Sequence, residues 1–136
     1  MSVSGFGGQK HSISNSGMML FQQGPITAIA GGIELDLVSA PIDPGVYTLE
    51  VNTTMGGIDI FLPHYVQFTI DGGSIVGGRD VHNGVDQWRK MQKKLRHIVP
   101  LPDEPPAFAL ANHDERPVSI RFILKTGVGG VDIYHL

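Results

Sequence analysis

Five glycine pairs open a repeated frame along the chain, and they constrain the fold more than any other feature. The pairs are Gly7-Gly8, Gly31-Gly32, Gly56-Gly57, Gly77-Gly78 and Gly129-Gly130. Their first residues lie at positions 7, 31, 56, 77 and 129, so three successive spacings fall between 21 and 25 residues and the last is 52. A recurring interval of this size is typical of proteins built from stacked repeats. Reuse of the pair also explains why the chain has 18 glycines.

Alternating residues follow the later pairs with the period of a β-strand. In each case apolar side chains face one side of the expected strand and an acid faces the other, as in "GGIELDL", "GGIDIFL" and "GGVDIYHL". Further strands are expected over 26–30, 46–55, 66–72 and 118–128. We expect each glycine pair to mark a corner, where φ is positive or where neighbouring backbone leaves no room for a Cβ.

The pattern predicts an all-β fold: a β-solenoid-like repeat of glycine-pair rungs with one inserted amphipathic α-helix. A Greek-key β-sandwich is the alternative, although it does not require turns at a constant offset from a glycine pair. The length of 136 residues suits a single β-repeat domain spanning 1–136. The longest spacing holds the insertion, which comprises a helix and a proline-rich run at about 84–113.

The helix is expected over 84–98, because Val85, Trp88, Met91 (or Gln92), Leu95 and Ile98 recur at helical spacing. Asn83 is the expected N-cap, and Pro100 closes the far end. Five of the ten basic residues of the chain lie on this helix: Arg89, Lys90, Lys93, Lys94 and Arg96.

The basic helix has two interpretations. It is either a surface helix whose basic side faces water, or a docking surface for an acidic partner or an anionic membrane face. On the second interpretation, the residues expected to bind a partner are those five basic residues together with the outward aromatics Phe61 and Tyr134.

Stacking in register would bring Glu34, Asp59, Asp80 and Asp132 into one column of acids. Such a column is either a solvated outer ladder or a divalent cation site. We favour the ladder, because calcium sites gather several oxygens from one loop and no such dense cluster occurs here. We therefore predict no metal site and no cofactor. Arg79 stands where the repeat expects an inward apolar residue, so its rung is either frayed or pairs Arg79 with a carboxylate.

Composition narrows the functional classes further. The formal net charge of −3 gives no overall attraction to nucleic acid, so no nucleic-acid partner is expected. The absence of cysteine excludes disulfides and thiolate chemistry. No segment is apolar enough to span a bilayer, so we expect a soluble, cytoplasmic chain that can reach a membrane face through a partner.

Catalytic motifs are missing from the sequence. The six histidines show no metal-ligand spacing, Ser74 lacks the glycine of a nucleophile elbow two positions later, and no phosphate-binding glycine loop is present. We therefore expect no enzyme. A small enzyme or ligand-binding protein would need a pocket between the inserted helix and the repeat.

The elements "QGPITAIAGGIELDLVSA", "VNTTMGGIDIFLP", "DGGSIVGGRD" and "TGVGGVDIY" resemble the C-terminal domain of LiaF-like (YvqF-like) proteins, the cell wall-active antibiotics response family. The resemblance covers most of the chain outside 84–115. It implies an all-β repeat domain, no catalytic residues, and a role in restraining a sensor kinase during the cell-envelope stress response. The expected function is thus a regulatory protein-interaction module whose partner is a membrane-associated sensor or an envelope component. A self-assembling, homo-oligomeric structural protein is the alternative, because the ends of a repeat expose unpaired strand edges.

Overall fold

Two five-stranded parallel β-sheets form the body of the protein. The structure is a computed structural model and describes residues 2–4, 9–12, 26–28, 32–76, 78–96 and 100–136. Sheet A has the order β1-β3-β5-β9-β7, with strands Ser2–Ser4, Ile26–Ala28, Gly45–Met55, Val118–Val128 and Val66–Val76. Sheet B has the order β2-β4-β6-β10-β8, with strands Gln9–Ser12, Ile33–Asp36, Ile58–Leu62, Val131–His135 and Arg79–Asn83.

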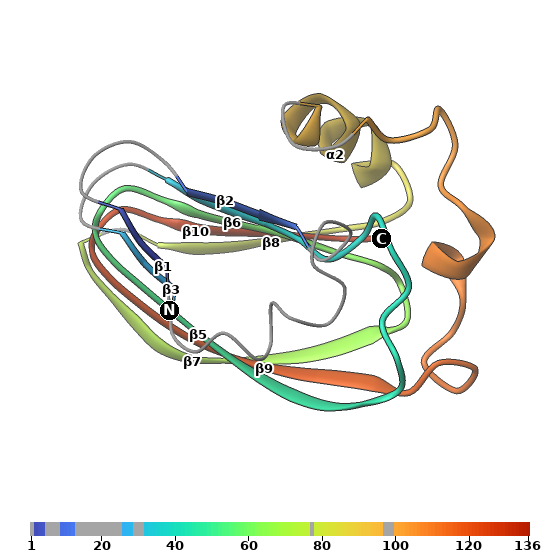
Figure 1. The fold of residues 1–136 in the computed structure, drawn as a ribbon, viewed down its shortest axis with the longest axis horizontal. Helices are drawn as coiled ribbons and strands as arrows, with labels where there is room; N and C mark the ends of the chain where they lie inside the picture. Colours follow the sequence, from blue (N-terminus) through green and yellow to red (C-terminus); the bar gives the residue numbers. More distant parts are fainter. Residues whose placement is uncertain (1, 5–8, 13–25, 29–31, 77, 97–99) are drawn as a thin grey trace.

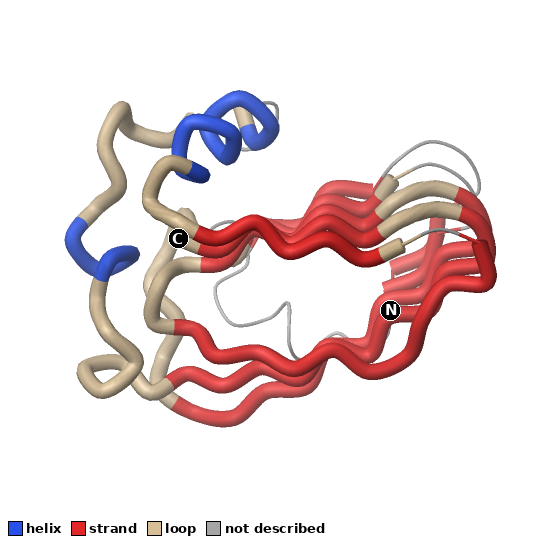
Figure 2. Tube along the Cα trace, turned by 180° about the vertical axis from the view of Figure 1, so that it is seen from behind, coloured by secondary structure: helices blue, strands red, loops and turns tan. Residues whose placement is uncertain are grey.

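The two sheets lie as layers facing each other (Figure 1). Figure 2 shows the strands of the two layers joined by corners on one side and by loops and helices on the other. Helix α2 (Gln87–Leu95) and a short 3-10 helix, η2 (Ala107–Leu110), both lie on the loop side, in the connection between β8 and β9. The described residues form ten strands and one short α-helix, so the predicted β-rich fold with one short inserted α-helix is confirmed.

Every described strand pair is parallel. A Greek-key sandwich is built from antiparallel neighbours, so its pairing differs from that of these sheets. Parallel neighbours instead follow when one repeated segment lies in the same direction on the next. The strands expected over 26–30, 46–55, 66–72 and 118–128 are all present as β3, β5, β7 and β9.

Each sheet A strand and the sheet B strand that follows it form one repeat unit, which we number 1 to 5 in chain order. Both sheets place the units in the order 1-2-3-5-4. The last unit of the chain therefore lies between units 3 and 4, and β10 pairs with β6 on one side and β8 on the other. The long connection that carries α2 and η2 lets the chain return past unit 4 before β9 begins at Val118.

The second glycines of the pairs stack at one corner, as predicted. The amide nitrogens of Ile33, Ile58 and Val131 donate hydrogen bonds to the carbonyl oxygens of Gly57, Gly130 and Gly78, respectively, each at 2.9 Å. Gly129 shows both expected reasons for glycine: its φ is +139°, and an added Cβ would lie 1.9 Å from the carbonyl oxygen of Gly56. The pair Gly7-Gly8 lies outside the described residues.

The main core fills the space between the sheets. It is made of the inward residues of the repeat units, and members that are completely buried include Ile33, Ile58, Val51, Phe122 and Ile133. Arg79 occupies the same row as Ile33, Ile58 and Val131, but its side chain is exposed because unit 4 lies at the end of the stack. Its inward position opens to solvent there, so the fold accommodates a charge at that place.

Candidate functional site

Helix α2 begins and ends inside the predicted range. It spans Gln87–Leu95, and Asp86 is the N-cap residue in place of the predicted Asn83. Asn83 belongs to β8, so its backbone is committed to the sheet. Val85, predicted to pack, is 56% exposed because it precedes the helix, and Ile98 lies outside the described residues. Trp88, Met91 and Leu95 are buried as the spacing predicted.

These three residues anchor the helix on the outer face of sheet B. They form a second apolar cluster, which is separate from the core between the sheets and also contains Val38, Phe61, Ala109, Tyr134 and Leu136. The Trp88 indole Nε1–H donates a hydrogen bond to the Pro102 carbonyl oxygen at 3.0 Å, so the single tryptophan also ties the helix to the segment that follows it. Figure 1 shows α2 above sheet B, on the side away from sheet A.

The basic residues of α2 and of its C-cap, Arg96, divide into two groups. Lys94 lies across the sheet, with its Nζ 5.6 Å from the centre of the Tyr134 ring. The other four, which we call the basic face, are exposed: Arg89, Lys90, Lys93 and Arg96. None of these four lies within ion-pair distance of an acid in the described part of the chain. Lys94 is exposed as well, so the predicted set of five consists of one exposed cation that contacts the Tyr134 ring and the four cations of the basic face.

A shallow groove of about 460 Å³ runs along this helix. Its walls are Arg89, Lys93 and Arg96 from the basic face, Gln92 beside them, and Pro100 and Leu101 from the following segment. The Gln92 side chain donates to Asp103 Oδ1 at 3.3 Å, which holds that segment against the helix. The groove therefore combines three cations with a small apolar wall, and that combination suits an acidic peptide with an apolar side chain.

Beneath the helix, the predicted column of acids is present in a different order. The register runs Glu34, Asp59, Asp132, Asp80 across β4, β6, β10 and β8, because unit 5 lies inside unit 4. We call these residues the acidic row. Burial raises the pKa of the Asp59 carboxyl against the lowering effect of Lys94, and the like charges of Asp132 and Glu34 add to the rise. No group of three potential metal ligands occurs among the described residues.

A row of stacked rings runs beside the acidic row. Phe61, Tyr134 and His82 lie opposite one another in the register, with ring centres 5.2 Å apart for the first pair and 4.9 Å for the second. Asp132 Oδ1 lies 3.3 Å from Nε2 of His82 in the neighbouring unit. The carboxylate accepts a hydrogen bond when that nitrogen carries a proton, and the contact is an ion pair when the whole ring is protonated. Burial raises the pKa of the Tyr134 hydroxyl, and Lys94 opposes that rise.

The prediction that Phe61 and Tyr134 contact a partner needs correction. Both face outward from sheet B, as the alternation indicated, but α2 covers them. Phe61 is 0% exposed and Tyr134 is 6% exposed, so neither side chain presents a surface in this structure. Sequence spacing identified the outward face and the apolar side of the helix separately. It did not show that each covers the other.

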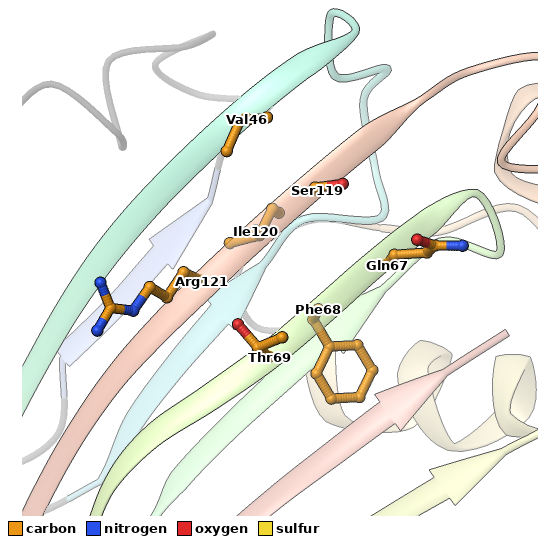
Figure 3. Close-up of a pocket in the computed structure, with 7 residues that line it drawn as sticks. All are labelled: Val46, Gln67, Phe68, Thr69, Ser119, Ile120 and Arg121. Atoms are coloured by element: carbon orange, nitrogen blue, oxygen red, sulfur yellow. The ribbon is translucent and has the colours of Figure 1, made fainter.

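The outer face of sheet A carries a second hollow, of about 230 Å³ (Figure 3). It is lined from three neighbouring strands by Val46, Gln67, Phe68, Thr69, Ser119, Ile120 and Arg121. Figure 3 shows Phe68 directed toward sheet B. Arg121 is paired with Asp71, so its charge is already engaged. The hollow therefore lacks the free charged groups that the groove beside α2 provides.

Several histidines have structural contacts. His64 and His113 bond to the carbonyl oxygens of Leu136 and Tyr65 at 3.0 and 2.9 Å. The His135 ring packs edge-on against Phe68, with 5.5 Å between ring centres, and burial lowers its pKa. These contacts connect the ends of strands on the loop side of the sheets.

In the described ranges, no helix has the length and apolar character needed to cross a membrane; α2 has nine residues. No protein-family model, curated protein or solved structure matches the chain.

Proposed function

We propose that this chain is a non-enzymatic protein-interaction module that binds an acidic partner through the basic face of α2. The observation that carries the proposal is an anchored helix with four exposed cations, three of which line a groove with an apolar wall. The fixed position of the helix favours binding, because little conformational freedom of the backbone is lost when a partner docks.

The chemistry of the groove specifies the partner. Arg89, Lys93 and Arg96 provide positive charge along one side of the helix, and arginine binds carboxylates in a bidentate manner. Pro100 and Leu101 offer contact to an apolar side chain. We infer an acidic segment that carries at least one apolar residue, in which charge guides the encounter and the apolar contact slows dissociation.

The repeat units support a finer description of the fold. We propose that they are the rungs of a short β-solenoid, because parallel strands recur in the same register in both sheets. The resemblance to the LiaF-like C-terminal domain suggests the setting: restraint of a membrane-associated sensor or envelope component during the cell-envelope stress response. A chain that works beside the cytoplasmic face of the membrane through such a partner fits this proposal.

The binding test uses a fluorescently labelled acidic peptide that contains leucines, and an oligoglutamate of equal charge as the second probe. The paired substitution Arg89→Gln/Lys93→Gln is compared with Arg121→Gln/Lys125→Gln, which removes the same charge from β9, away from the groove. We expect the first variant to bind the leucine-containing peptide at least about tenfold more weakly. Equal weakening by both variants would show that net charge alone is responsible.

Identification of the native partner requires a variant that keeps the helix docked. Lys94 is left unchanged for this reason, since it contacts Tyr134. Crosslinked capture from the host compares the intact chain with Arg89→Ser/Lys90→Ser/Lys93→Ser. A partner lost only with the variant, and then rebound by the purified intact chain, supports the docking surface. Equal recovery with both baits contradicts it.

A further inference from the structure

The stack of repeat units ends in open strand edges. In the described part of the chain, β7 and β8 of unit 4 form one edge of the two sheets, and β1 and β2 of unit 1 form the other. β7 has 11 residues, so a long row of its backbone groups has no partner on the outer side among the described strands. Such edges pair readily with another chain when the incoming strand fits their register and charge.

The register row that contains the acidic row extends by one position to Lys10, so its two end residues have opposite charges. Lys10 of β2 occupies the register position beside Glu34, and the row continues through Asp59 and Asp132 to Asp80 of β8. Asp80 is exposed, and its neighbour in the row, Asp132, carries the same charge. Like charges directly opposite are unfavourable, whereas opposite charges stabilise a strand pair.

A neighbouring row of the register is polar at both ends. It runs Gln9, Ile33, Ile58, Val131, Arg79 across units 1, 2, 3, 5 and 4. The three inner members are apolar and buried, and both end members are polar. An apolar residue added opposite Arg79 would bury the guanidinium without a partner, whereas unit 1 has the polar residue Gln9 at that register position.

We propose that a second copy of this chain adds its unit 1 to the unit 4 edge and continues both sheets in the same register. This places the partner subunit's Lys10 opposite Asp80 and the partner subunit's Gln9 opposite Arg79. In sheet A, continuation of the register sets the partner subunit's Ser2 opposite Gly72, since Ser2, Ile26, Val51, Leu124 and Gly72 occupy one row. The surface used is distinct from the basic face, so this inference goes beyond the proposed function.

The contact joins two different edges, so it leaves a free edge at each end of every assembly. An interface of this kind generates open stacks that lengthen with concentration, in contrast to a closed dimer. Neighbouring copies would continue the strand spacing of about 4.8 Å. The opposing account is that the polar residues of units 1 and 4 act as caps, as terminal repeats often do. On that account the chain stays monomeric.

Sedimentation velocity of the 136-residue chain from micromolar to near-millimolar concentration distinguishes the two accounts. We expect the weight-average sedimentation coefficient of the wild type to rise with concentration. Asp80→Lys and Lys10→Glu are each expected to remain monomeric. An equimolar mixture of these two variants is expected to associate again, because each edge then meets an opposite charge. Glu104→Lys alters net charge as much as Asp80→Lys but lies outside both edges, so it should associate like the wild type.

Three outcomes would overturn the proposal: a wild type that is monomeric throughout, association that Asp80→Lys does not weaken, or single variants whose mixture stays monomeric. Circular dichroism of each variant confirms that the sheets are intact before its sedimentation is interpreted. The acidic-peptide assay on the same samples separates this contact from the basic face, because peptide binding should survive Asp80→Lys unchanged.

Discussion

The outer faces of the two sheets belong to the same repeat units but meet different surroundings. On sheet B, the outward residues Phe61 and Tyr134 are covered by α2 and join a second apolar cluster. On sheet A, the outward Thr48, Thr69 and Arg121 are exposed. The two faces show that the inward residues hold the sheets together, while the outward residues decide what covers each sheet. Docking of the helix is therefore a local property of sheet B.

The largest expected effect comes from removing the cover of sheet B. Trp88→Ala deletes a side chain that is only 3% exposed, together with its hydrogen bond to Pro102, and should lower the free energy of unfolding by about 3–5 kcal/mol. Urea denaturation followed by circular dichroism measures this change. Val46→Ala is the matched truncation on sheet A, where the side chain is 84% exposed, and should change stability by less than about 0.5 kcal/mol. Similar losses for the two variants would remove the distinction between the faces.

A substitution at the shared corner should affect both faces together. Gly129→Ala forces a Cβ against the Gly56 carbonyl oxygen in a backbone conformation that favours glycine, and we expect a loss of about 2–4 kcal/mol. Hydrogen exchange should show weaker protection in β9 and β10 and also in their neighbours β5 and β6. Gly78→Ala is the control, since a Cβ there meets no atom within 4 Å. A loss of hydrogen-exchange protection that is confined to one sheet would contradict a corner shared by both sheets.

Removing the contact of Lys94 with sheet B should have a smaller effect on the free energy of unfolding. Burial lowers the pKa of Lys94, but Tyr134 and Asp59 outweigh it and raise the pKa above its usual value, so the charged form is favoured in the folded state. Lys94→Gln should lower the free energy of unfolding by about 0.5–1 kcal/mol, as expected for an exposed cation over an aromatic ring. Lys90→Gln, at an exposed position of the same helix, should change it less. Guanidinium denaturation of both variants tests whether Lys94→Gln loses more stability than Lys90→Gln.

The smallest effect should depend on pH and concerns Asp59. Its raised pKa means that the folded state binds the proton more tightly than the unfolded chain, so its contribution to stability falls as pH rises above the usual carboxyl pKa of 3.8. Asp59→Asn imitates the protonated form. Relative to wild type, the variant should gain stability between acidic and neutral pH. Thermal unfolding of both proteins across that range measures the difference, and Glu104→Gln serves as the exposed control. A difference that is constant with pH would contradict this interpretation.

Much of the fold follows from local pattern. The period-two runs predicted the strands, and the constant offset from each glycine pair predicted that Glu34, Asp59, Asp132 and Asp80 share a row. The helical spacing of Trp88, Met91 and Leu95 likewise predicted which side of α2 is buried. These features depend on neighbours in sequence or on repetition, and both can be read from the residues themselves.

Other features depend on contacts between distant segments. The repeat units resemble one another, so a local pattern does not decide which unit lies beside which, and the order 1-2-3-5-4 was not predicted. Burial of Phe61 and Tyr134 depends on where the helix docks, and that position follows from the long connection rather than from either strand. The candidate groove beside α2 also forms only when Pro100 and Leu101 fold back along the helix. The spacing of residues along the sequence therefore does not predict the order of the units, the docking position of the helix or the groove.

The interior position of unit 5 has a consequence for biosynthesis. A ribosome releases β5, β6, β7 and β8 before β9 and β10, although the later strands separate the earlier ones in both sheets. While the nascent chain lacks unit 5, β7 has no β9 to pair with, and units 3 and 4 each lack the neighbour that they have in the finished sheets. Pairing over such long sequence separations slows folding. Completion of the sheets must therefore wait for the final residues of unit 5, and a chaperone that shields free edges would act most usefully just before their synthesis.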